Sequence, residues 1–318
     1  MLWLITRLLS RMAILFGTIV VASIILFTLL AVLPGNPAQV ALGVNASPAA
    51  LKQTMAEFGT DRPLVIQYLS WFGNFLHGSF GRSYLTHAAI GPQIADRAQV
   101  TATLVLLGTA VAIVVAVPLG VAAAVMHRKK VGTLLSGITQ FGMAIPSFIA
   151  AILLIDIFAV RLHWLPSGGW TPPGTDIGMF LRQISLPVLS LGLIEAALLS
   201  RYVRSATLNV LREDYMRTAR AKGLTLGRAF LRHGVRNVAI PVVTVLGLEV
   251  AALLVGAIII ESVFVMPGLG GLLLDSVSNR DLLLVQGIVM ILLVAVLVVN
   301  FITDALYLLI DPRLRSST

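Results

Sequence analysis

The stretch EDYMRTARAKGLTLGRAFLRHGVRN (Glu213–Asn237) is polar and basic, yet it lies between two strongly apolar runs. It holds six of the chain's 23 lysine and arginine residues, although 58% of all residues are hydrophobic. A chain of 318 residues with only 12% charged residues and several long uncharged runs is typical of proteins that cross a membrane many times. The position of this basic stretch relative to the bilayer therefore decides how the chain is organised.

Six segments are long and apolar enough to cross a bilayer. A helix needs roughly 20 apolar residues to span about 30 Å of hydrocarbon. The uncharged run from Met12 to Leu33 exceeds the apolar region of a signal peptide, which favours a retained first helix over a cleaved signal. The sequence thus predicts an all-α membrane protein with six transmembrane helices, at Ser10–Leu33, Val100–Met126, Leu134–Val160, Ile184–Val203, Val238–Glu261 and Leu282–Leu309.

The distribution of positive charge orients these spans. With six spans both termini lie on one side, and if that side is the cytoplasm the inner segments hold 16 of the 23 lysine and arginine residues. Cytoplasmic loops carry such an excess, so cytoplasmic N- and C-termini are expected. The predicted organisation is residues 1–33 as cytoplasmic N-terminus and first helix, 34–99 as an extracytoplasmic subdomain, and 100–318 as a five-helix core that includes a cytoplasmic loop at 204–237.

The extracytoplasmic segment carries helix signals and does not resemble a disordered linker. Ser47 and Pro48 predict an N-cap and a first-turn proline for a helix that ends at Phe58. Pro63 begins a second helix whose apolar face carries several aromatic residues, Tyr68 and Trp71 among them. This subdomain is expected to pack on the spans, and contact with an external delivery protein remains an alternative role.

Local signals divide the basic stretch itself into two short helices. Glu213 and Asp214 begin the first helix, where the helix dipole favours anions, and Lys222 lies at its end, where the dipole favours cations. Gly223 is well placed to terminate that helix, and Thr225 to cap the second. One face of the first helix is expected to carry Tyr215, Met216 and Ala219, and one side of the second Leu226, Ala229, Phe230 and His233.

Three roles compete for this element. A basic tether that fixes topology and binds anionic lipid headgroups needs positive charge but no defined helices. Nucleic-acid binding requires a folded basic patch with stacking aromatics, which the stretch lacks. Two capped helices with small residues favour a docking site for a cytoplasmic partner. These observations support docking and the lipid tether about equally, and they support nucleic-acid binding far less.

The chain lacks several kinds of chemistry. It has no cysteine, no histidine pair at metal-ligand spacing and no GxxxxGK[ST] phosphate loop. Neither a cofactor nor a metal is therefore expected in this chain, and any ATP hydrolysis must come from a partner. Glu195 and Glu249 fall near the middle of predicted spans, where charge is costly. They either hydrogen-bond between helices or line a translocation pathway and meet a cationic group of the substrate.

The pattern DYMRTARAKG followed by RHGVRNVAIP resembles the cytoplasmic EAA loop of permease subunits of bacterial ABC importers, in the dipeptide and oligopeptide branch. The resemblance covers nearly the whole chain. Seven further segments look like that branch in the same order: LPGNPA at Leu33, FGTDRPLVIQYLSWF at Phe58, GSFGRS at Gly78, AIPSF at Ala144, RLHWLPSGGW at Arg161, ESVFVMPGLGGLLLDSVSNRD at Glu261 and DPRLR at Asp311.

This resemblance implies a type I permease fold, similar to the first permease of dipeptide and oligopeptide systems, in the inner membrane of a bacterium. Such a chain is not an enzyme by itself. Its implied partners are a second related permease, two ATPase subunits that bind ATP and Mg²⁺, membrane lipid and an extracytoplasmic substrate-binding protein. Peptides are the expected cargo. Nickel or metallophore complexes, glutathione and other small solutes are alternatives within the family, and a gradient-driven secondary carrier is the alternative outside it.

The resemblance also implies which residues dock. The loop would enter a surface cleft of an ATPase, so that ATP-driven closure of the two ATPases rocks the spans. One departure from the pattern is Arg217, which stands where a glutamate is usual, six residues before the glycine. Glu213 or Asp214 is then expected to supply the acidic contact. The expected docking residues are Glu213, Asp214, Tyr215, Arg217, Ala219, Lys222 and Gly223.

Overall fold

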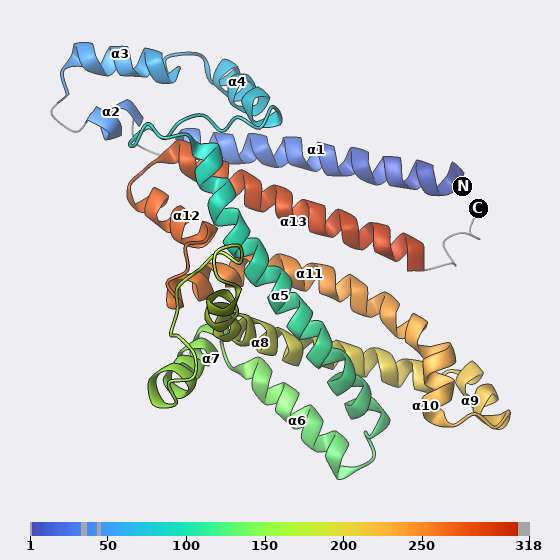
Figure 1. The fold of residues 1–318 in the computed structure, drawn as a ribbon. Coiled ribbons are helices and arrows are strands. Elements are labelled where there is room, and N and C mark those ends of the chain that lie inside the picture. Colours follow the sequence, from blue (N-terminus) through green and yellow to red (C-terminus); the bar gives the residue numbers. More distant parts are fainter. Residues whose placement is uncertain (1, 33–36, 43–45, 311–318) are drawn as a thin grey trace. The chain divides into compact units, whose positions relative to one another are not determined.

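The computed structural model describes residues 2–32, 37–42 and 46–310, and these residues are almost entirely helical (Figure 1). They include no β-strand, and the isolated bridge between Arg82 and Ala89 lies in a loop. The predicted end of the first span at Leu33, the start of the LPGNPA segment and the DPRLR segment lie outside the described residues. The all-helical fold class predicted from the sequence is confirmed.

Five described helices are long and apolar enough to cross a membrane without a break. Each contains or largely overlaps a predicted span, and most extend beyond it. The third, Ile177–Arg212, has 36 residues and is about 54 Å long at a rise of 1.5 Å per residue, so it continues well past the hydrocarbon. The five are α1 (Leu2–Val32), α5 (Ile90–Val125), α8 (Ile177–Arg212), the run of α10 and α11 from Leu226 to Val263, and α13 (Leu282–Ile310).

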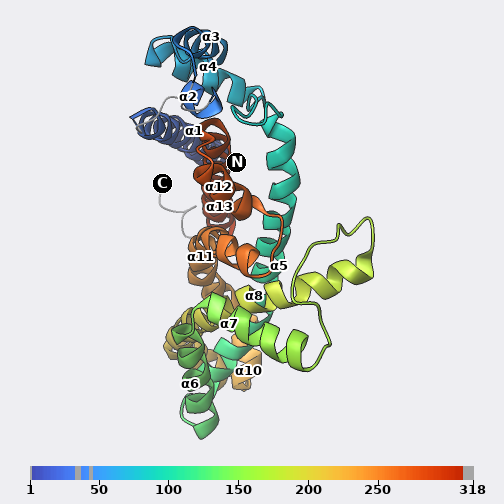
Figure 2. The same ribbon diagram turned by 90° about the vertical axis from the view of Figure 1, so that its left-hand side faces the viewer.

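The predicted third span, Leu134–Val160, is not one straight helix. The chain forms α6 (Lys130–Ala144) and then α7 (Ser147–Leu154), which passes into the π-helix η1 (Ile155–Arg161), with a bend of 98° at the break (Figures 1 and 2). Ile145 and Pro146 are extended at this point, with ψ of 119° and 142°. Proline pushes the residue before it out of the helical region, which explains the break.

The chain folds as two compact units, and the larger is built around α8. This first unit contains residues 102–266 and the two chain ends. Helix α8 packs against α6, α7 and α11, and in Figure 1 it runs between α11 and α6. Glycines allow α5 to approach α8 closely, because a Cβ on Gly192 would lie only 2.8 Å from the carbonyl oxygen of Gly108. Ser200 also donates a hydrogen bond to the Ala116 carbonyl of α5 at 3.4 Å.

The second unit contains residues 10–101 and 267–297. The predicted helix signals in its N-terminal part are confirmed: Ser47 accepts a hydrogen bond from the Ala50 amide at 3.2 Å, and Pro63 caps the following helix. The aromatic face of that helix packs on α1, where the hydroxyls of Tyr68 and Ser23 lie 2.9 Å apart. The short helices of this unit are α2 (Pro37–Leu42), α3 (Pro48–Phe58), α4 (Leu64–Leu76) and α12 (Leu269–Ser278).

Candidate functional site

The basic stretch contains a short helix, α9 (Asp214–Ala221), that follows α8 after a single residue. That residue, Glu213, has extended backbone angles (φ −65°, ψ 146°), so it ends α8 and begins α9 at the same point. Its amide donates back to the Val210 carbonyl of α8 at 3.2 Å. Because only one residue connects the two helices, the backbone angles of Glu213 set the direction of α9 relative to α8.

Helix α9 ends as the sequence predicts. Gly223 has a φ of +90°, the left-handed conformation that glycine adopts most readily. Its amide donates to the Arg220 carbonyl at 3.0 Å, and the Leu224 amide donates to the Ala219 carbonyl at 3.3 Å. This pair of hydrogen bonds is a Schellman motif, which satisfies carbonyls that the helix end would otherwise leave unpaired.

The second predicted helix begins where expected but does not end within the stretch. The Thr225 hydroxyl accepts a hydrogen bond from the Arg228 amide at 3.5 Å, which confirms the predicted cap. Helix α10 (Leu226–Ala229) then continues through the π-helix η2 (Phe230–Gly234) into α11 (Val235–Val263). The prediction of a second short helix, separate from the next span, is therefore wrong. The helix is continuous from Leu226 to Val263. At Gly234 the chain forms a π-helical turn, and the helix does not end there.

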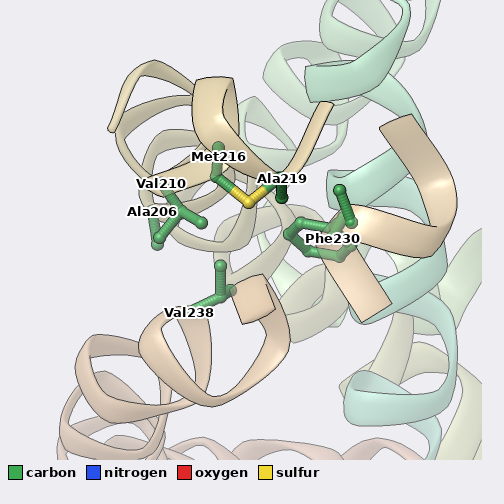
Figure 3. Packing of buried hydrophobic residues seen from close by; sticks show 7 residues of the cluster. Ala206, Val210, Met216, Ala219, Phe230 and Val238 are labelled. Carbon is green, nitrogen blue, oxygen red and sulfur yellow. The ribbon is translucent and has the colours of Figure 1, made fainter. Parts of the chain in front are cut away.

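A buried apolar cluster, which we call the α9 cluster, holds α9 against the membrane helices (Figure 3). Met216 is only 1% exposed and Phe230 only 6%. Burying an apolar side chain of this size stabilises folding by about 1.5–3 kcal/mol. Gly234 makes room for the Phe230 ring, since a Cβ there would lie 2.6 Å from a ring carbon. The cluster consists of Ala206 and Val210 of α8, Met216 and Ala219 of α9, Ala229, Phe230 and Val238.

The opposite face of α9 is exposed and charged. Arg217 forms an ion pair with Asp214 at 3.1 Å, with both side chains largely exposed. Glu213 is exposed too, and its carboxylate makes no ion pair or hydrogen bond with any described residue. Two open hollows flank the C-terminal end of α9 and are lined mainly by polar and basic side chains. The lining of one hollow includes Tyr215, Thr218, Lys222 and Arg232. The lining of the other includes Arg217, Arg220, Gly223 and Thr225.

Most of the predicted docking residues are exposed, but one of them is buried. Glu213, Asp214, Arg217, Lys222 and Gly223 lie on the exposed face. Ala219 differs from them, because its side chain is 7% exposed and belongs to the α9 cluster. Its small size therefore serves the close packing of α9 on its own chain, whereas sequence reasoning assigned that closeness to a partner.

Sequence reasoning also missed two contacts across the stretch. Asn237 donates a hydrogen bond to the Tyr215 hydroxyl at 2.7 Å, although 22 residues separate them. Val238, expected as the first residue of a span, packs into the α9 cluster. The apolar face of α9 and the nearby Phe230 indicate half of this cluster in the sequence. The α8 residues that complete it could not be identified, because they lie in a segment in which apolar residues occur on every face of the helix.

The two mid-span acids, Glu195 and Glu249, come together in the structure. They lie on α8 and α11, two helices in extensive contact, and their carboxyl groups interact. Glu195 is 7% exposed, and its Oε1 atom is buried without a hydrogen-bond partner. The positive charge of Arg201 acts on Glu249. Two neighbouring carboxyl groups, one of them with an unsatisfied buried oxygen, can receive a cationic group.

The whole described chain is similar to known transport proteins. Residues 116–316 match the family described as binding-protein-dependent transport system inner membrane component, and residues 1–107 match the N-terminal family of the same membrane components. Among solved structures, the chain aligns with one chain of the inward-facing MetNI methionine ABC transporter at a TM-score of 0.57, with 17% identity, covering 69% of this chain and 96% of that one. This second likeness shows a shared fold.

Curated relatives cover the chain almost from end to end. A Brucella suis biovar 1 (strain 1330) protein named "Putative peptide permease protein" is 38% identical over 96% of this chain and 98% of its own length. The oligopeptide transport system permease protein AppB of Bacillus subtilis (strain 168) is 34% identical over 98% and 99%. The glutathione transport system permease protein GsiC of Escherichia coli O1:K1 / APEC is 35% identical over 96% and 97%. The chain belongs to the binding-protein-dependent transport system inner membrane components, and it is thus a multi-pass permease subunit of the inner membrane.

Proposed function

We propose that this permease carries short peptides and that α9 is its contact with an ATPase subunit. The family works with ATPase and substrate-binding subunits, so an element that receives the ATPase motion is required. The observation that carries the assignment to α9 is its two-sided construction. One face is fixed to α8 and to the α10–α11 helix through the α9 cluster, and the other is exposed and charged.

This construction supplies a mechanism. When two ATPases close on ATP, a surface that holds α9 moves with them. Since a packed apolar cluster resists deformation, the displacement of α9 passes to α8 and α11 as rigid elements. Glu213 is our choice for the acidic contact, because Asp214 is already paired with Arg217. Arg217, Lys222 and Gly223 would complete the contact surface.

The sidedness follows from charge. Placing α9 and both termini in the cytoplasm puts 16 of 23 lysine and arginine residues there, as the positive-inside rule favours. This orientation makes α9 accessible to cytoplasmic ATPases and turns the loop after α1 outward, towards a binding protein. The proposed complex contains this chain, a second related permease, two ATPases that bind ATP and Mg²⁺, and one extracytoplasmic binding protein.

The cargo assignment rests on the relatives, whose names specify peptides, oligopeptides and glutathione. Glutathione is itself a modified tripeptide, so these names agree on a small solute with free amino and carboxyl groups. Glu195 and Glu249 support the same class, because an adjacent pair of acids suits a peptide amino terminus. Nickel or metallophore complexes are the alternative that the family allows.

Reconstitution with the co-encoded subunits tests this proposal. We expect di- and tripeptides presented by the binding protein to stimulate ATP hydrolysis and to enter proteoliposomes only when ATP is supplied. Nickel chelates and glutathione form the comparison panel. Uptake that persists without the ATPases and collapses with the proton gradient would instead identify a secondary carrier. Stimulation by a nickel chelate alone would reassign the cargo.

A further inference from the structure

A further hollow lies within the second unit. Its volume is about 500 Å³, and its walls come from α3, α4, the loop before α5 and the beginning of α13. Sites for small molecules typically measure about 300–1,000 Å³ and combine apolar walls with a few polar groups. The size therefore suits a small solute.

One wall of this hollow is aromatic. The rings of Phe58 and Tyr84 stack at 4.2 Å between centroids, and Trp71 lines the same space. Burial, and then the negative charge of Asp281, raise the pKa of Tyr84, so its phenol stays neutral. A neutral aromatic wall attracts an apolar side chain of a ligand.

Hydrogen bonds hold the loop that carries Tyr84 in place. Ser83 is buried and donates a hydrogen bond to the carboxylate of Asp281, and its hydroxyl also accepts from the Thr86 amide at 3.0 Å. The Ile90 amide donates to the Gly81 carbonyl at 3.1 Å, which closes the base of the loop. These hydrogen bonds lie within the chain and fix the position of the wall, and such preorganisation lowers the cost of binding.

Charges of both signs line the hollow. Arg62 and Arg82 are exposed and form no ion pair with any described residue. Glu57 stands in the last turn of α3 and accepts a hydrogen bond from Gln53 at 3.1 Å, which leaves its other carboxylate oxygen available. Two free guanidinium groups suit a carboxylate, and a carboxylate suits an ammonium group.

We propose that this hollow binds short peptides, with the peptide carboxylate on Arg62 and Arg82, the amino terminus on Glu57 and an apolar side chain against Phe58, Trp71 and Tyr84. This inference rests on the proposed function, because it supplies that permease with a peptide site of its own, built from other residues than α9 and the Glu195–Glu249 pair. The hollow combines side chains of both charges with an aromatic wall, and these match the charged ends and the apolar side chain of a short peptide.

Calorimetry on the permease–ATPase complex in phosphatidylcholine nanodiscs, without nucleotide or binding protein, tests the proposal with the tripeptide Ala-Phe-Ala. We expect Arg62→Gln and Arg82→Gln each to weaken binding by about tenfold or more, as the loss of a charge-assisted hydrogen bond would. Amidation of the peptide carboxylate is expected to weaken binding to the native protein similarly, and to cost little more in the Arg62→Gln, Arg82→Gln double variant.

Control variants keep the test decisive. Lys52→Gln and Arg280→Gln remove exposed positive charges from the same unit outside the hollow, and we expect unchanged binding. Arg62→Lys keeps the charge and should retain part of the affinity. Native-like peptide affinity in both glutamine variants overturns the proposal, as does displacement of the peptide by glycerophosphoethanolamine, which assigns the hollow to a lipid headgroup. ATP-driven uptake measured in parallel separates failure of this site from failure of the proposed function.

Discussion

Tyr215 and Asn237 are joined by a hydrogen bond of 2.7 Å that connects the exposed side of α9 to the first turn of α11. Asn237 also donates to the His233 carbonyl at 3.4 Å, so its amide bridges the end of the π-helical turn and α9. The α9 cluster joins the same elements on the buried side. Helix α9 is therefore attached to α11 on two sides, one polar and one apolar.

Removing this hydrogen bond should weaken coupling more than assembly. We expect Tyr215→Phe and Asn237→Ala each to keep the ATPase bound but to lower peptide uptake per ATP hydrolysed by about two- to tenfold, since one such bond contributes about 1 kcal/mol. The two effects should not add, because both variants remove the same bond. Thr218→Val is the control, as its hydroxyl bonds only to its own helix at Asp214. Strictly additive losses of coupling would count against the connection.

The buried side can be tested through Met216. Met216→Ala leaves a cavity in the α9 cluster and is expected to cost about 2–5 kcal/mol of local stability. Met216→Leu preserves the volume and should cost less than about 1.5 kcal/mol. Limited trypsin cleavage after Arg217, Arg220 or Lys222 measures the effect, and it should accelerate in the alanine variant only. Equal cleavage rates in both variants would show that the cluster does not hold α9.

Substitutions at Gly223 can distinguish the need for a left-handed backbone conformation from the need for a small residue at the proposed ATPase contact. A Cβ at this position would meet no atom of the chain within 4 Å, so any folding cost arises from the φ of +90°. Asparagine tolerates this conformation better than other residues. We expect Gly223→Asn to keep the ATPase bound, Gly223→Ala to weaken binding modestly, and Gly223→Arg to insert into the membrane but lose the ATPase. Pull-down of the complex measures each result, and an unimpaired arginine variant excludes the contact at Gly223.

Close packing of α5 on α8 predicts a stability effect within the membrane. Gly192→Ala would place a Cβ 2.8 Å from the Gly108 carbonyl oxygen and 2.9 Å from Val111, and it should destabilise the protein by about 1–3 kcal/mol through overpacking. At Gly256 a Cβ meets only Leu191, at an ordinary 3.5 Å, so Gly256→Ala is expected to be neutral or slightly stabilising. Thermal unfolding in detergent compares the two. A Gly192 variant as stable as the Gly256 variant would contradict the close approach.

Local signals in the sequence predicted the features that local physics decides. The caps at Ser47 and Thr225, and the termination of α9 at Gly223, follow from hydrogen bonds and backbone freedom within a few residues. Apolar length likewise located the spans. These features depend on which residues are neighbours in the chain, so no knowledge of the fold is needed to predict them.

Features that depend on tertiary contacts were not predictable in the same way. Pro118, Pro187 and Pro241 lie inside continuous helices, whereas Pro146 marks a bend of 98°. All four remove a backbone donor, and the sequence cannot tell which helix the surrounding packing keeps intact. The hollow of the second unit was missed for a related reason, because its walls join residues of α3 and α4 to α13, more than 200 positions away.

The meeting of Glu195 and Glu249 leads to the most direct test of the pathway. If the pair receives the amino terminus of the cargo, Glu195→Gln and Glu249→Gln should each slow uptake of peptides with a free amino group, because neutral amides attract an ammonium group less strongly. Uptake of an N-acetylated peptide should change little. ATPase association is the control for folding. Unchanged uptake rate and selectivity in both variants would give the pair a purely structural role, as a hydrogen-bonded contact between α8 and α11.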